Sequence, residues 1–361
     1  MSAAEAPTDV PVADLPSGAP IPSSIPPPTA DSSSSSPPSS NNSSKAAPRL
    51  PLSFLLSAPS RLDAFIAHLN RCMQTPSGAD AVLQFVCYTS RLSSALLASL
   101  AGHVLARRSA SELVALALAL PSRATAILFT TAAAAAASPA VVVVPTGGVR
   151  AGAETAAARA ALLLSARLKA LSGLCSEART ITRLWALLGL YFWARSLVLE
   201  TAASLSSTSS SSGDEKQGTA AAAAHPRKSL GEHLVAWAQL LGCLGFQVLE
   251  NGAYLSSRGV LGWGPEAQAR AGVWSVRAWG VFVGLEIGRL AAQLSSPDGR
   301  ARLAAAGELD ASRKTLARNL AWAPLVVHWG GGGYLPDAAV GLLGCVPGTI
   351  GMRDLWKKTA A

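Results

Sequence analysis

The sequence predicts an all-α fold, a helical integral membrane protein with a basic amphipathic helix and a disordered N-terminal tail. Half of the 361 residues are hydrophobic and only 14% are charged, whereas about 25% is usual in a soluble domain. Alanine and leucine dominate the chain beyond residue 50, and the alternation typical of strands is absent. The net charge of +9 favours an anionic lipid surface as the partner.

Changes in composition divide the chain into six segments. The first is rich in Pro and Ser and cannot bury enough apolar surface to fold. A second Ser- and Ala-rich stretch separates two halves. The predicted segments are a disordered tail (1–50), N-terminal helices (51–123), an Ala/Val-rich insertion (124–158), an amphipathic membrane-active region (159–199), a linker (200–229) and a C-terminal helical membrane region (230–361).

The first helices follow the tail. Apolar residues recur at helical spacing over 61–74, and the sequence TPSG at 75–78 predicts the end of that helix. A second helix is expected over 80–100.

The stretch 162–188 has the strongest helical pattern. At about 100° per residue its apolar side chains share one face, and basic and hydroxyl side chains occupy the other. Such a helix lies in the headgroup plane of a membrane and expands one leaflet. We expect the membrane-inserting face to be Leu164, Leu168, Leu171, Leu174, Cys175, Ala178, Ile181 and Trp185. We expect Lys169, Arg179 and Arg183 to anchor lipid headgroups.

Two windows in the C-terminal region are predicted to span the bilayer. The first, 273–294, is aromatic but contains Arg277, Glu286 and Arg289, so the carboxylate needs a partner. The second, 334–352, is rich in small residues and is followed by a basic end. Its Gly341, Gly344 and Gly348 are expected to be transmembrane packing positions, because small residues allow helices to approach closely.

No motif supports catalysis. The five histidines never fall at metal-ligand spacing, the five cysteines never form a C-x-x-C pair, and neither H-E-x-x-H nor G-x-S-x-G occurs. We therefore expect no enzyme activity, no cofactor and no metal. Basic residues are spread singly, without the dense clusters of nucleic-acid-binding proteins.

Four segments share their sequence pattern with one known family. They are LKALSGLCSEARTITRL (168–184), GADAVLQFVCYTSRL (78–92), GFQVLENGAYLSSRGVLGW (245–263) and YLPDAAVGLLG (334–344). The first is similar to the Leu-Ser-x-x-Arg-x-x-x-Arg-Leu helix of the peroxin-eleven family of peroxisomal membrane proteins, and the second to its N-terminal helix. The third resembles the central segment of that family and the fourth its C-terminal membrane segment. The order of the segments is the same, and the resemblance is strongest to the fungal C-type or gamma-type branch.

The resemblance implies a protein of the peroxisomal membrane that elongates and remodels this membrane through an amphipathic helix and promotes peroxisome fission and proliferation. It also implies self-association into a homo-oligomer. A dynamin-related fission GTPase and its tail-anchored adaptor are the implied partners, besides membrane lipids.

Two other functions stay open. Charges within the window 273–294 are also typical of a multi-pass peroxisomal solute carrier or pore, and amphipathic faces that pack together are typical of a soluble helical adaptor. Topology is open as well, because the basic loop 295–321 favours the cytosol whereas the resemblance places it in the lumen.

Overall fold

The computed structural model describes residues 51–105, 110–136, 148–209 and 230–360. Within these ranges the chain forms eleven α-helices and no strand, which confirms the predicted all-α class. The predicted tail 1–50 and residues 210–229 of the predicted linker lie outside the described residues. The helices are α1 (Pro51–Met73), α2 (Pro76–Leu105), α3 (Ala110–Leu118), α4 (Ser122–Ala136), α5 (Gly148–Arg183), α6 (Ala186–Ser209), α7 (Leu230–Ser257), α8 (Pro265–Ser295), α9 (Pro297–Ala305), α10 (Leu309–Gly330) and α11 (Asp337–Lys358).

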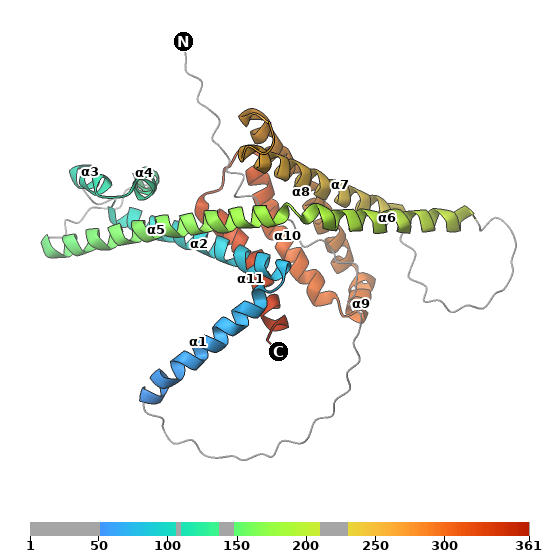
Figure 1. Ribbon diagram of the computed structural model, residues 1–361, viewed down its shortest axis with the longest axis horizontal. Helices are drawn as coiled ribbons and strands as arrows, with labels where there is room; N and C mark the ends of the chain where they lie inside the picture. The colour runs from blue at the N-terminus through green and yellow to red at the C-terminus, as the bar shows by residue number, and fades with distance from the viewer. Residues whose placement is uncertain (1–50, 106–109, 137–147, 210–229, 361) are drawn as a thin grey trace, which may run out of the picture.

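Two helices organise the packing. Helix α2 lies between α5 and α11, and helix α8 lies between α7 and α10. Contacts between α10 and α11 join these two groups. In Figure 1, α5 and α6 follow one another as a long rod across the molecule, with α2 running beside α5.

Helix boundaries follow local chemistry and extend beyond the predicted ones. Helix α2 begins at Pro76, where Thr75 Oγ1 accepts a hydrogen bond from the Gly78 amide at 3.1 Å and so caps the first turn. The predicted insertion 124–158 contains most of α4 and the start of α5, and α6 continues into the predicted linker as far as Ser209. Alanine-rich composition explains the helices within 124–158, because alanine has the highest helix propensity of all residues. The end of α6 has more Ser and Thr than Ala, and the Thr201 and Ser204 hydroxyls donate to carbonyls of the preceding turn.

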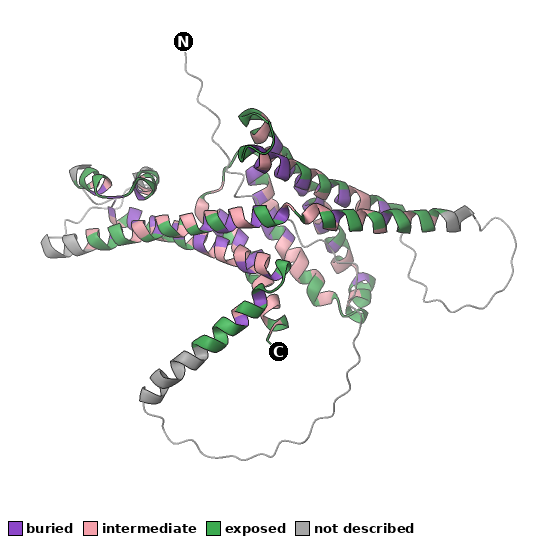
Figure 2. Ribbon diagram, viewed as in Figure 1, coloured by how far each residue is buried: buried purple, intermediate pink, exposed green. Residues whose placement is uncertain are grey.

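An aromatic cluster forms the core where α2, α7, α8 and α10 meet. Trp279 is fully buried, with its ring centroid 5.6 Å from that of Trp322 and 6.1 Å from that of Phe246. Tyr88 of α2 packs edge-on against Trp322 at 5.7 Å. Figure 2 shows buried residues gathered around this crossing, whereas much of α6 is exposed. This core fixes how the two groups of helices meet.

Three of the glycines of α11 lie against α2. A Cβ at Gly341 would stand 2.8 Å from the backbone of Leu92, and one at Gly348 would stand 3.3 Å from Phe85 Cα. A Cβ at Gly344 would overlap the ring of Tyr88. The two backbones therefore approach closely because these three positions lack side chains.

Replacing Gly341 with Ala should destabilise the fold, because the added methyl group meets the backbone of α2 and not a movable side chain. We expect the free energy of unfolding to fall by about 1–3 kcal/mol. Thermal unfolding of the full chain in neutral detergent micelles measures the change.

The matched control is Gly351→Ala in the same helix, where a Cβ meets nothing within 4 Å. This variant should be unchanged or more stable by up to about 1 kcal/mol, because alanine favours the helix. Equal stabilities of the two variants would contradict the close α2–α11 contact.

Candidate membrane-contacting site

The polar stripe of α5 faces inward. Ser165 Oγ donates to the Ser94 carbonyl at 2.9 Å, and Ser94 Oγ donates to the Ser165 carbonyl at 2.8 Å. Further along, Cys87 Sγ lies 3.4 Å from the Ser172 carbonyl. All four side chains are buried. Small hydroxyl and thiol side chains thus allow α2 and α5 to pack closely and satisfy one another's polar groups.

Arg179 belongs to this buried stripe. Its side chain is only 1% exposed, and its Nε donates to Asp80 Oδ1 at 2.9 Å. Burial opposes the charged form of Arg179, but the nearby Asp80 carboxylate outweighs it and raises the pKa of the guanidinium. The pair ties the end of α5 to the start of α2.

Arg183 ends α5 in a second buried ion pair. Its Nη2 and Nε donate to the two carboxylate oxygens of Glu250 in α7, at 2.6 and 2.9 Å. Glu250 is completely buried, and burial raises the pKa of its carboxyl although the charge of Arg183 acts in the opposite direction. A bidentate pair of this kind fixes orientation as well as distance, so it sets how α5 meets α7.

The apolar stripe of α5 faces outward, opposite to the ion pairs. The predicted inserting face divides into an exposed part and a part turned toward the bundle. Leu174 is 65% exposed and Trp185 is 73% exposed. Leu164, Leu171 and Ile181 are also exposed, whereas Leu168 and Ala178 are partly buried and Cys175 is buried.

The three predicted lipid anchors lie in different surroundings. Lys169 is exposed, and its Nζ donates to Asp337 Oδ2 at 2.8 Å. Arg179 and Arg183 are buried within the bundle, which corrects the expectation that their side chains face headgroups. The reason is that the polar side of α5 finds its partners in α2 and α7, so this side is the interior one.

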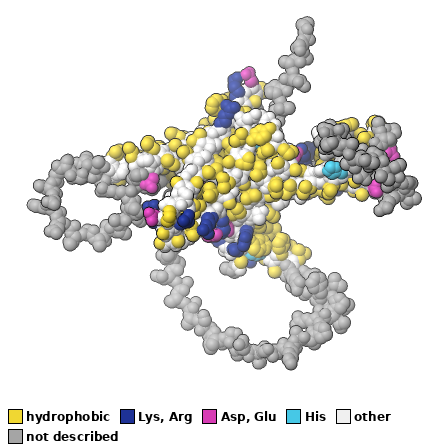
Figure 3. Space-filling model, turned by 180° about the vertical axis from the view of Figure 1, so that it is seen from behind, with side chains coloured by type: hydrophobic (Ala, Val, Ile, Leu, Met, Phe, Trp, Pro, Cys, Tyr) yellow, Lys and Arg dark blue, Asp and Glu magenta, His cyan; other side chains and the backbone are white. Residues whose placement is uncertain are grey.

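Helix α6 extends the apolar surface beyond α5. Large hydrophobic side chains are exposed along it, and two of them are aromatic. Figure 3 shows that hydrophobic side chains also cover much of the opposite face of the molecule, with charged side chains in small groups near its margins. Exposed apolar patches of this extent mark interaction surfaces. The exposed side chains of α6 are Leu188, Tyr191, Phe192, Val198, Leu199 and Leu205.

The charged residues of the window 273–294 have partners within the chain. Glu286 accepts hydrogen bonds from Arg289 one turn later and from Gln239 of α7, the latter at 2.9 Å. Arg277 donates to the Gly330 carbonyl and lies over the ring of Trp274. These charges therefore stabilise contacts of α8 with α7 and α10.

Hydropathy selects a different helix from those expected to span a bilayer. Among the described residues, one helix, α2, is long and apolar enough to do so by length and composition. Helix α8, which contains the predicted span 273–294, and helix α11, which contains the predicted span 334–352 from Asp337 on, do not meet this criterion. In the same described ranges, no three His, Cys, Asp or Glu side chains come together as a metal site.

Comparison with known proteins adds no relative: no family model, curated protein or solved structure matches the chain.

Sequence reasoning missed the acidic partners of the amphipathic helix. Asp80 lies 99 residues before Arg179, and Glu250 lies 67 residues after Arg183. The one available signal was that each carboxylate sits in an apolar helical segment, where it needs a cation.

Replacing Glu250 with Ala should strongly destabilise the bundle, because it leaves the Arg183 charge buried without its carboxylate. The free energy of unfolding should fall by about 3–5 kcal/mol. Replacing both partners, as Arg183→Met with Glu250→Leu, should recover most of that loss. Denaturant unfolding of the full chain in micelles measures all three proteins.

Lys169→Ala is the matched control, since it also removes a cation of α5 but from an exposed pair. Its effect should stay within about 1 kcal/mol. An equal effect of Glu250→Ala and Lys169→Ala would show that the buried pair does not hold α5 to α7.

Proposed function

We propose that this chain is a membrane-remodelling protein, whose α5 lies in one leaflet with its apolar stripe among the acyl chains. The observation that carries the proposal is the orientation of α5. Its polar stripe is engaged in serine contacts and two buried ion pairs, while large hydrophobic side chains project outward. Exposed apolar side chains do not stabilise a protein surface in water, whereas they are favourable among the acyl chains of a leaflet.

The aromatic side chains at the junction of α5 and α6 support an interfacial position. Trp185 and Tyr191 are both exposed, at 73% and 63%. Their amphipathic rings favour the headgroup level of a bilayer. Burying one large aliphatic side chain contributes about 1.5–3 kcal/mol, so a few such residues suffice for stable association.

The resemblance to the peroxin-eleven family supports the location and the biological role. We propose that the protein resides in the peroxisomal membrane, elongates it before fission and self-associates there. Recruitment of a dynamin-related fission GTPase and its tail-anchored adaptor belongs to the same proposal. Integral attachment to the membrane belongs to the same proposal. Because α2 runs beside α5 (Figure 1), it lies along the leaflet with α5 and does not cross the bilayer.

Replacing both Leu171 and Ile181 with Glu should abolish tubulation of anionic vesicles, because two charges then occupy the inserting stripe. Both side chains are exposed, so the fold should persist. Flotation with vesicles measures binding, electron microscopy scores tubules, and circular dichroism checks the helix content.

The matched control is Val114→Glu with Leu118→Glu, which places two charges on exposed positions of α3. This variant should tubulate vesicles like the parent chain. Unchanged tubulation by the α5 variant would reject α5 as the wedge, and release of a trapped solute without tubulation would favour the carrier.

Raised expression of the tagged chain should give elongated or more numerous peroxisomes that overlap with the protein. Fluorescence imaging beside a peroxisomal membrane marker measures both overlap and shape. A diffuse signal, or a signal on another organelle, would contradict the peroxisomal part of the proposal.

A further inference from the structure

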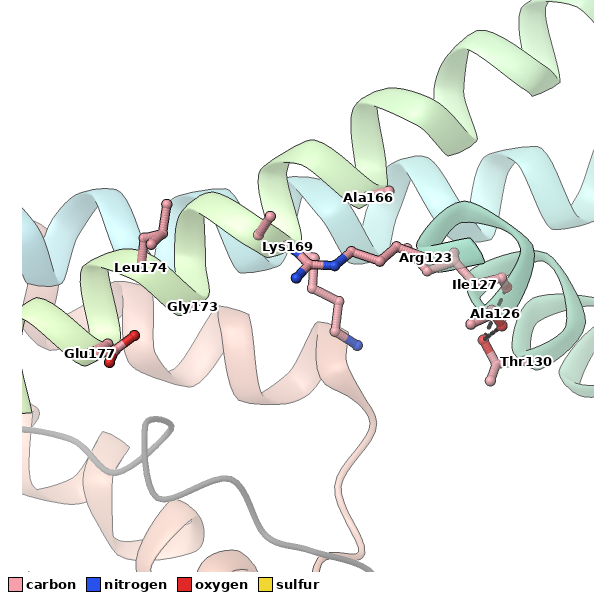
Figure 4. Close-up of a pocket in the computed structure, with 10 residues that line it drawn as sticks. Arg123, Ala126, Ile127, Thr130, Ala166, Lys169, Gly173, Leu174 and Glu177 are labelled. Carbon is pink, nitrogen blue, oxygen red and sulfur yellow. Dashed lines mark hydrogen bonds between the residues drawn. The ribbon is translucent and has the colours of Figure 1, made fainter. Parts of the chain in front are cut away.

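We propose that a groove between α4 and α5 binds one phospholipid of net negative charge, with the phosphate held by Arg123 and Lys169. The groove has a volume of about 510 Å³, within the range of small-molecule sites. Arg123 and Ile127 line it from α4, and Lys169 and Gly173 from α5. Figure 4 shows the Arg123 side chain extending from α4 toward Lys169 on α5.

The two cations have charge available for an anion. Within the described residues, Arg123 is exposed and has no hydrogen-bond or ion-pair partner. Lys169 shares Asp337 with Arg91, and each of these ion pairs is 2.8 Å long. One carboxylate thus faces two cations, so the Lys169 charge is only partly balanced. Arg and Lys side chains are frequent phosphate ligands, and these two line the groove from its two walls.

The acidic residue of the groove explains why the lipid should be anionic. Glu177 also lines the groove, and its Oε1 accepts a hydrogen bond from Tyr254 at 3.3 Å and pairs with Arg258. With Arg258 balancing the Glu177 charge, Arg123 and Lys169 leave the lining of the groove with a net positive charge. This positive charge favours a headgroup of net negative charge over a zwitterionic one.

The rest of the groove suits an acyl chain. Ile127 and Leu174 supply apolar walls, and a Cβ at Gly173 would meet nothing within 4 Å, so the space above this glycine is open. Leu174 also belongs to the outward stripe of α5. The groove therefore opens beside the surface proposed to contact the leaflet, and on this point the inference rests on the proposed function.

The test uses the full chain in neutral detergent micelles with phosphatidylglycerol that carries a fluorescent acyl chain. Anisotropy should report saturable binding, about tenfold tighter than that of phosphatidylcholine with the same chain. Gly173→Leu should abolish binding, because its side chain fills the space that is open above this glycine. Arg123→Gln should weaken binding about tenfold.

The matched control is Arg167→Gln, which removes one exposed charge of α5 outside the groove. Its affinity should equal that of the parent chain. Unchanged binding by Gly173→Leu would overturn the groove, and equal binding of the two lipids would overturn the charge selectivity. If millimolar inorganic phosphate, which has no acyl chain, displaces the lipid, the site binds free phosphate and the lipid proposal is overturned.

The micelle assay needs no bilayer, so its outcome is separable from that of the tubulation assay. Saturable lipid binding without tubulation would leave the groove in place and reject remodelling. Tubulation by a Gly173→Leu variant that no longer binds the lipid would leave remodelling in place, with the groove dispensable for it. If the parent chain neither binds the lipid in micelles nor tubulates vesicles, both proposals are overturned.

Discussion

The polar stripe of α5 is the constraint on which the rest of the structure depends. Buried hydroxyl groups and guanidinium groups must be hydrogen-bonded or paired. Along α5, Ser165, Arg179 and Arg183 find partners in α2 and α7, namely Ser94, Asp80 and Glu250, and Thr180 is hydrogen-bonded within α5. Because Arg183 and Glu250 form two parallel hydrogen bonds, α5 cannot rotate about its axis without losing them. The orientation of the helix is therefore fixed by polar contacts, and its apolar stripe is left outside.

Close approach of the backbones is the second consequence. Serine pairs at the α2–α5 contact and glycines at the α2–α11 contact place small residues on two sides of α2. Such contacts gain little from the hydrophobic effect and much from packing and hydrogen bonds, which is the balance found for helices in lipid. Among the helices that the structure describes, α2 is also the one with the length and composition of a span. Large aliphatic side chains are accordingly exposed along α5, α6 and α7 and are not gathered into a single core.

Sequence periodicity predicted the helices well and the direction of their faces poorly. The all-α class, the amphipathic character of 162–188 and the stripe of small residues in 334–352 all follow from local patterns. A helical pattern gives the angle between the polar and apolar faces of α5, but not which face meets the bundle. That choice depends on Asp80 and Glu250, which are 99 and 67 residues from their partners in the chain. Lys169 lies at the edge of the polar stripe, whereas Arg179 lies at its centre. This difference in angle around the helix axis leaves Lys169 exposed.

The fixed orientation of α5 also restricts how it could bend a membrane. A helix that folds on contact with lipid would turn its polar face to the headgroups, but here that face is held by α2 and α7 before any lipid is met. On the proposed function, the inserting element would be a preformed rod of 36 residues, about 54 Å long at 1.5 Å per residue. A preformed helix loses no conformational entropy of folding when it binds the membrane, unlike a segment that folds on binding. Inserted rods that lie parallel to one another would expand the leaflet across their long axis. The membrane would then curve in that one direction only, which is the curvature of a tubule.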